Sequence, residues 1–163
     1  MTSYLIKGVS VLGGTPGDLL LKDGVIQDTY VESDDRVEVV DAAGLIALPG
    51  LVDLHTHLRE PGREDAETVE SGTSAAALGG FTAVHAMANT EPVADTAGVV
   101  EQVWRLGREA GHCDVYPVGA VTVGLRGKAI ATEVPILSRS VACAASAIRM
   151  NGSSLVSSTT RPS

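Results

Sequence analysis

The sequence predicts an α/β protein in which a small β-domain precedes an incomplete (β/α)8 barrel of about three βα units. Short strands punctuated by glycine come first, over residues 1–43. Strand and helix patterns then alternate over residues 44–128, as is typical of parallel βα units. A complete barrel of this type needs about 250 residues, whereas the chain has 163. We therefore expect only the first part of such a barrel.

The β-domain is predicted from three stretches. Tyr4–Leu12 has the pattern of a strand, Asp18–Tyr30 that of a hairpin turning at Lys22-Asp23-Gly24, and Val37–Val40 that of another short strand. An Asp-Gly step supports the positive φ angles that a two-residue hairpin turn requires. None of these stretches places catalytic residue types in a useful pattern, so we expect the chemistry to lie later in the chain.

The alternating part contains strands and helices in the order β-α-β-α-β. The strands are predicted over Gly44–Leu54, Phe81–Met87 and Asp114–Val123, and the helices over Ala66–Leu78 and Thr96–Ala110. Apolar residues recur at helical spacing in both helices, and glycine follows each one. The first strand is almost continuously apolar, which indicates burial on both faces, as in a parallel sheet.

Residues 129–163 differ in composition from the rest of the chain. They are rich in serine and alanine, and they contain one acidic residue against three arginines. We recognise no further βα unit there and expect a tail that matches no barrel sequence. A disordered genuine tail, a frame shift and a truncation all remain open as its origin.

Composition narrows the class of protein. A net charge of −8 argues against nucleic acid or an anionic membrane surface as the default partner. No apolar run reaches the roughly 18 residues of a membrane helix, and the amino terminus lacks the basic and apolar segments of a secretion signal. Cys113 and Cys143 are too few for a disulfide framework. Together these features favour a cytoplasmic protein.

The stretch most indicative of chemistry is Pro49–Gly62, with the sequence PGLVDLHTHLREPG. His55 and His57 are two residues apart, so in a strand both imidazoles point to the same face, and Asp53 shares that parity. Two neutral imidazoles that converge on one point can bind a metal such as zinc. The alternative is a pair of exposed loop histidines, because zinc takes about four ligands. Histidines after a buried strand occupy the place where barrel enzymes keep their active sites, which favours the metal site.

The stretch Pro49–Gly62 resembles the first barrel strand and loop of the amidohydrolase superfamily. Its HLREPG form, His57–Gly62, resembles class I dihydroorotases in particular. The resemblance extends over about Met1–Lys128. It implies reversible cyclisation of N-carbamoyl-L-aspartate to L-dihydroorotate in pyrimidine biosynthesis, with one or two zinc ions in complete relatives. It also implies that residues 1–43 form half of a β-sandwich.

The resemblance assigns roles to four residues. It implies that His55 and His57 bind zinc and that Arg59 and Asn89 bind the substrate. A guanidinium can pair with a carboxylate through two hydrogen bonds, although Arg59 alone would suggest a surface ion pair with Glu60 or Glu64. Asn89 lies in the sequence MANT, where the family usually has MPNT; as a lone loop residue it would suggest a turn.

The remaining groups of the family site are not recognisable in this chain. They are a bridging acidic or carboxylated lysine residue, later histidines, and an acid/base aspartate. We therefore assign no catalytic residue and expect the chain alone to be inactive. We expect Asp53 to orient a histidine, and we interpret His85 as a core or supporting histidine rather than a ligand.

Two other functions stay open from the sequence. One is a non-catalytic, dihydroorotase-like scaffold that partners aspartate transcarbamoylase; the other is a related cyclic amidase, hydantoinase or allantoinase. The amidases share the metal motif, and Arg59 within HLREPG favours dihydroorotase over them. A homodimer is a further possibility for relatives of this type.

Overall fold

The structure, a computed structural model, describes residues 3–27 and 37–132. The chain divides into two compact units, Met1–Gly50 and Leu51–Ser163, and each unit is described by itself. The end of the predicted hairpin, Cys143 and nearly all of the predicted tail at residues 129–163 lie outside the described residues.

The first unit is a single mixed sheet in the order β3-β2-β1-β4, in which β5 also pairs with β1. β2 pairs antiparallel with both β1 and β3, whereas β4 and β5 run parallel to β1. Asp23 and Gly24 have φ angles of 53° and 78°, so the predicted two-residue hairpin turn is confirmed. The strands are β1 (Ser3–Val11), β2 (Pro16–Lys22), β3 (Val25–Gln27), β4 (Val37–Asp41) and β5 (Ile46–Ala47).

The predicted strand over Gly44–Leu54 is wrong in one respect, because the structure divides it in two. Its first part is β5, which belongs to the first unit, and its second part is β6 (Leu51–Thr56), which opens the second unit. Pro49 lies between them and has no N–H for a sheet hydrogen bond. The division between units therefore falls after Gly50, whereas the sequence pattern starts the barrel-like part at residue 44.

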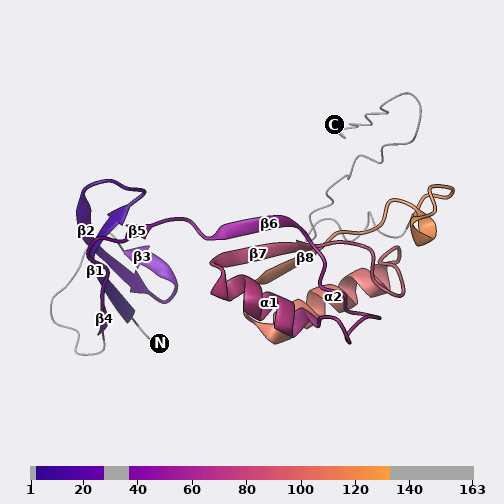
Figure 1. Ribbon diagram of the computed structural model, residues 1–163, viewed down its shortest axis with the longest axis horizontal. Coiled ribbons are helices and arrows are strands. Elements are labelled where there is room, and N and C mark those ends of the chain that lie inside the picture. The colour runs from indigo at the N-terminus through magenta and orange to yellow at the C-terminus, as the bar shows by residue number, and fades with distance from the viewer. Residues whose placement is uncertain (1–2, 28–36, 133–163) are drawn as a thin grey trace, which may run out of the picture. The chain divides into compact units, whose positions relative to one another are not determined.

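The second unit has the βαβαβ order that the sequence predicts. Its parallel sheet has the order β6-β7-β8, and both helices lie on one face of it (Figure 1). This arrangement confirms an α/β fold with parallel strands. A short 3-10 helix, Val123–Leu125, follows the sheet. The further elements are α1 (Val69–Leu78), β7 (Phe81–Ala86), α2 (Ala97–Ala110) and β8 (Asp114–Pro117).

Two clusters of buried apolar side chains hold this unit together. The first lies between sheet and helices and contains Leu58, Val69, Val84, Ala86, Val103 and Val115. α2 approaches the sheet closely because Gly107 is buried against Val115, where a Cβ would overlap the valine side chain. The second cluster lies under the loops after β7 and β8 and contains Ala88, Ala94, Val100 and Ala120. These loops are thereby anchored to α2.

The structure shortens two predicted elements. α1 begins at Val69 rather than at Ala66, because Thr68 caps it and forms a capping box with Ser71. β8 ends at Pro117 rather than at Val123. Val118 N–H still donates to the carbonyl of Ala86 in β7 at 2.7 Å, and Ala120 N–H then donates to the carbonyl of Ala94 at 2.8 Å.

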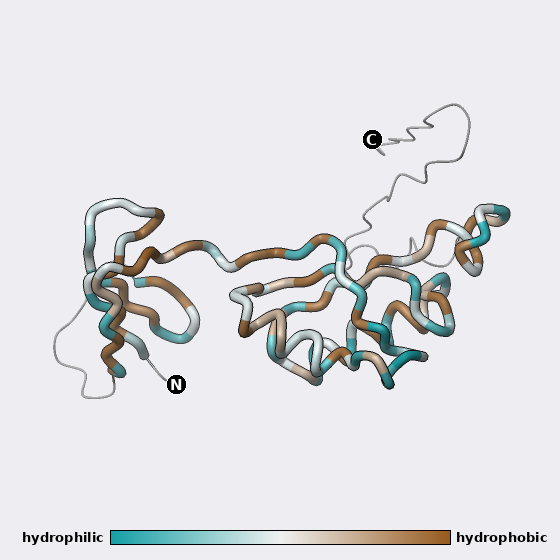
Figure 2. The backbone as a smooth tube through the Cα atoms, in the orientation of Figure 1, coloured by the Kyte–Doolittle hydropathy of each residue, from teal (hydrophilic) through white to brown (hydrophobic). Residues whose placement is uncertain are grey.

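β6 has the sequence LVDLHT: three of its six residues are apolar, Asp53 lies among them, and His55 and Thr56 form its hydrophilic carboxyl end (Figure 2). Leu51, Val52 and Leu54 are each at least half exposed.

No helix in residues 3–27 and 37–132 has both the length and the apolar character that crossing a membrane requires.

Candidate functional site

The candidate site is a cavity of about 340 Å³ at the carboxyl ends of the three parallel strands. His55 and His57 reach it from β6 and the residue after it, and Met87–Asn89 reach it from the loop after β7. Val118–Thr122, which follow β8, line the rest together with Leu125 and Gly127. Parallel α/β sheets bind their ligands at this end of the strands.

The two imidazoles lie close together. The ring centroids of His55 and His57 are 5.1 Å apart, and the ring planes meet at 69°. The backbone between them is not regular, because Asp53 pairs with Val84 but Thr56 pairs with Ala86, so β6 has one residue more than β7 over this stretch. A bulge of this kind redirects side chains next to a site. Simple alternation therefore does not describe how these histidines are aimed.

Asp53 differs from its expected role. Its Oδ1 accepts a hydrogen bond of 2.9 Å from the backbone N–H of His55, rather than contacting an imidazole. The carboxylate thus stabilises the backbone of the bulge, and it affects the direction of the His55 ring only through the main chain. Sequence parity could not reveal this contact, because parity assumes a regular strand.

Asn89 contacts the second histidine directly. Its Oδ1 lies 2.7 Å from Nδ1 of His57, although the two residues are 32 positions apart. The structure therefore brings together three of the four residues that the sequence singled out: both histidines and the asparagine line one cavity.

A connection between the first two loops, which we call the loop brace, sets their positions. Glu91 N–H donates to the carbonyl of Pro61 at 2.9 Å, and Gly62 packs against Glu91 so closely that a Cβ there would lie 2.5 Å from the Cβ of Glu91. Gly62 has a φ of 106°, which favours glycine. The loop brace joins the turn after His57 to the turn after Asn89.

Arg59 lies in the same loop but does not line the cavity. It is exposed, and its φ of 63° lies in the left-handed region, which is uncommon for residues with a side chain. The ion pair with Glu60 or Glu64 that the sequence allowed is not among the salt bridges of residues 3–27 and 37–132. Both acids accept hydrogen bonds from backbone N–H groups instead.

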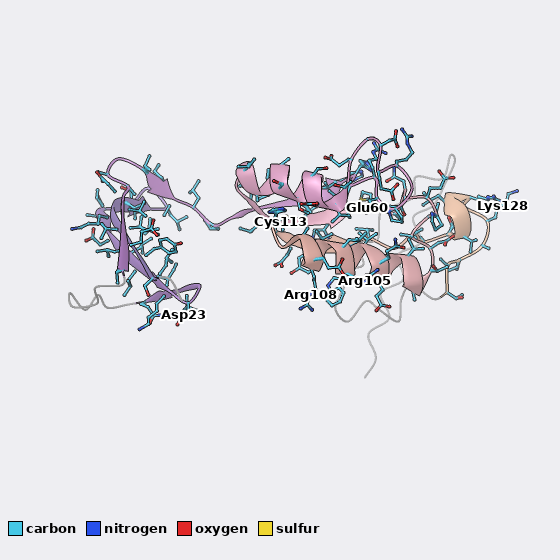
Figure 3. All side chains as sticks on the ribbon, turned by 90° about the horizontal axis from the view of Figure 1, so that it is seen from below. Asp23, Glu60, Arg105, Arg108, Cys113 and Lys128 are labelled. Atoms are coloured by element: carbon cyan, nitrogen blue, oxygen red, sulfur yellow. The ribbon has the colours of Figure 1, made fainter. Side chains whose placement is uncertain are left out.

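Glu60 and Gly62 have structural roles that the sequence reasoning missed. Glu60 lies near the start of α1 (Figure 3), where its Oε2 accepts from Val69 N–H at 2.7 Å. The HLREPG motif thus supplies a hydrogen-bond acceptor for the first residue of α1. The glutamate and the glycine of this motif were the sequence signal for these structural roles. The Gly62 N–H donates to Glu64 and lowers the pKa of that carboxyl group. The hydrogen bond from Arg63 likewise lowers the pKa of Asp65.

The other histidines lie away from the cavity lining. His85 is partly buried beside Tyr116, with ring centroids 5.4 Å apart, and its Nδ1 finds no hydrogen-bond partner in the part of the chain that the structure describes. The sequence suggests a core or supporting histidine at this position. Such a histidine normally has a hydrogen-bond partner, and the described residues provide none for this nitrogen. His112 is exposed.

The donor set of His55 and His57 fits part of a zinc site. Hydrogen bonding at Nδ1 leaves Nε2 of His57 available, and the neighbouring ring supplies a second nitrogen donor. Two donors are fewer than the roughly four that zinc takes. Residues 3–27 and 37–132 contain no group of three or more His, Cys, Asp or Glu side chains placed to bind a metal.

A larger cavity of about 750 Å³ lies at the other ends of β7 and β8. Its lining includes Trp104, Arg108 and Tyr116, and none of the four residues expected at the site. Arg108 lies over the Trp104 ring at 4.9 Å. The two imidazoles thus line the smaller cavity at the strand carboxyl ends and not the larger one.

Comparison with known proteins places the chain in a family. The family model for dihydro-orotase-like proteins matches residues 44–158, which extends beyond the point where the motif resemblance ends. The dihydroorotase of Streptomyces coelicolor is 64% identical over 132 residues, which cover 80% of this chain and 31% of that protein. The dihydroorotase of Mycobacterium tuberculosis is 52% identical over 143 residues, which cover 86% and 33%. The chain thus spans about a third of the length of these curated relatives.

Solved structures of cyclic-amide hydrolases share the fold. L-hydantoinase (dihydropyrimidinase) from Arthrobacter aurescens superposes with a TM-score of 0.61 at 25% identity, over 75% of this chain and 28% of that one. D-hydantoinase from a Thermus species gives a TM-score of 0.53 at 24% identity, over 73% and 28%. With a family model that matches most of its length, the chain belongs to the dihydro-orotase-like family.

Proposed function

We propose that this chain carries the amino-terminal part of a zinc-dependent dihydroorotase, which interconverts N-carbamoyl-L-aspartate and L-dihydroorotate. The convergence of His55, His57 and Asn89 in one cavity at the strand carboxyl ends is the observation that carries the proposal. The dihydroorotase names of its curated relatives favour this substrate over hydantoin-type rings and over a non-catalytic scaffold. The sheet β6-β7-β8 would then be the first part of a (β/α)8 barrel.

The histidines are the proposed metal ligands. A zinc ion held by His55 and His57 would polarise a carbonyl oxygen and provide hydroxide near neutral pH. The chain's contribution is to present two neutral imidazoles from a bulged strand end, next to a cavity that can take a small ring.

Arg59 and Asn89 are the proposed contacts to the substrate carboxylate. A guanidinium pairs with a carboxylate through two charge-assisted hydrogen bonds, and Arg59 is exposed without a salt bridge in residues 3–27 and 37–132. The Asn89 amide group can donate a further hydrogen bond. Because the loop brace joins their two loops, it would fix the spacing between these donors.

Catalysis requires groups beyond those described here. The described residues supply two of about four zinc ligands, so we expect the 163-residue chain by itself to show no turnover. Release of N-carbamoyl-L-aspartate from L-dihydroorotate by the purified chain would contradict that expectation.

A ligand-binding experiment tests the substrate assignment without requiring turnover. The purified chain is titrated with L-dihydroorotate and with dihydrouracil, the same ring without its carboxylate, and amide shifts are followed by NMR. L-Dihydroorotate is expected to shift the residues around the cavity and to bind more tightly. Arg59→Lys is expected to weaken its binding about tenfold, since charge-assisted hydrogen bonds contribute roughly 1.5–3 kcal/mol.

Arg63→Lys is the matched control, because Arg63 lies in the same loop but pairs with Asp65 at 3.2 Å. It is expected to leave L-dihydroorotate binding unchanged. Equal affinities for the two rings, or equal effects of the two lysine substitutions, would contradict the assignment of Arg59.

A further inference from the structure

The contact between His57 and Asn89 defines where the imidazole proton lies. A carboxamide oxygen can only accept a hydrogen bond, so at 2.7 Å the Nδ1 of His57 must donate to Oδ1 of Asn89. In a neutral imidazole the other nitrogen, Nε2, then carries the lone pair. A free histidine in water favours the opposite tautomer, with the proton on Nε2. The contact therefore favours the form that is less populated in water.

We propose that Asn89 is a positioning residue that holds His57 as the Nδ1–H tautomer, so that Nε2 faces the metal site ready to bind. This inference deepens the proposed function and rests on the zinc role of His57 given there. It adds a second task for Asn89: the amide oxygen orients the metal ligand, while the amide nitrogen stays available for the substrate carboxylate.

The backbone around Asn89 suits an orienting role. Met87 N–H donates to the carbonyl of Thr56 at 2.8 Å, which joins the loop to the end of β6 immediately before His57. Ala88 is 6% exposed and belongs to the second apolar cluster. On the other side, Glu91 is fixed by the loop brace. The backbone is thus fixed on both sides of Asn89, whose amide oxygen lies 2.7 Å from Nδ1 of His57.

The two tasks are separable because they use different atoms of one side chain. Asn89 Nδ2 makes no hydrogen bond to another group in residues 3–27 and 37–132. Aspartate at this position keeps an acceptor for His57 but loses the donor and adds a negative charge. Alanine removes both. The two substitutions therefore have opposite expectations for metal binding and the same expectation for carboxylate binding.

The first experiment reads the tautomer in the metal-free chain. Long-range ¹H–¹⁵N spectra are recorded at pH 8, where histidine is largely neutral, and His57→Gln identifies the His57 signals. The wild-type chain is expected to show His57 mainly as Nδ1–H, and Asn89→Asp to preserve that form. Asn89→Ala is expected to move His57 mainly to Nε2–H. Gln102→Ala, which removes an amide on α2, is the control and should change nothing.

The second experiment measures zinc affinity with zinc ion alone, by competition with a chromogenic chelator. Loss of a residue that orients a metal ligand commonly lowers affinity 10- to 100-fold. Asn89→Ala is expected to lose affinity by about this factor, whereas Asn89→Asp is expected to match or exceed the wild type. Circular dichroism of each variant checks that the exposed substitution leaves the fold intact.

The outcomes separate this inference from the proposed function. An unchanged His57 tautomer in Asn89→Ala overturns the positioning role, whatever the zinc result. If Asn89→Ala alters the tautomer but His55→Ala and His57→Ala leave zinc affinity unchanged, the positioning role of Asn89 stands. The zinc role assigned to the histidines is then refuted, and with it the proposed function. An altered tautomer with the expected fall in affinity supports both.

Discussion

Replacing Gly62 by alanine tests whether the loop brace holds the two site loops together. A new Cβ would lie against the carbonyl oxygen of Glu91 and 2.5 Å from its Cβ, so one loop must move. The φ of 106° also lies in a region that residues with a side chain rarely adopt. Backbone strain of this kind costs about 1–3 kcal/mol, and overpacking costs about 1–3 kcal/mol. We therefore expect Gly62→Ala to lower the free energy of unfolding of the second unit by about 2–6 kcal/mol.

Gly80→Ala provides the matched control in the same unit. Gly80 also has a positive φ, of 84°, but a Cβ there would meet nothing within 4 Å. Its substitution should cost only the backbone term, about 1–3 kcal/mol. The difference between the two variants therefore isolates the clash with Glu91.

Urea unfolding followed by tryptophan fluorescence measures both variants. Trp104 is the only tryptophan of the chain and lies on α2, so the signal reports on the second unit. If Gly62→Ala and Gly80→Ala unfold at the same urea concentration, the two loops can separate without cost and the reasoning about the loop brace is refuted.

Two further predictions concern other parts of the second unit. Glu60→Ala removes the acceptor for Val69 N–H; we expect a loss of about 1 kcal/mol in the same urea experiment, typical of a lost helix cap, and no loss would show that water replaces the carboxylate. Burial, with a smaller contribution from Asp114, raises the pKa of Cys113. The stability from this neutral thiol is therefore fully present below the unfolded pKa and is lost as the pH rises through the folded one. In a Cys143→Ser background, iodoacetamide at pH 8 should modify Cys113 more slowly in the folded chain than in urea, and equal rates would contradict the shift.

Much of the fold was predictable because its signals are local. Alternating apolar patterns, glycines after each helix and the Asp23-Gly24 turn each depend on a few neighbouring residues, and the structure confirms the helices, the hairpin and the parallel strand order. The boundary errors have local causes too. A continuous apolar run cannot show that Ile46–Ala47 pairs with β1 while Leu51–Thr56 pairs with β7. That choice depends on partners distant in the sequence.

The residue types of the site, two histidines, an arginine and an asparagine, were already evident in the segments HTHLREPG (residues 55–62) and MANT (residues 87–90). Their roles in zinc and substrate binding remain predictions. What only the tertiary structure decided is how they are arranged: the bulge that sets the His55 backbone, the bond from His57 to Asn89, and the loop brace through Gly62. The bulge is a departure from regular strand geometry, and the other two contacts join residues far apart in the chain. All three exist only once the strands have paired and brought their carboxyl ends together.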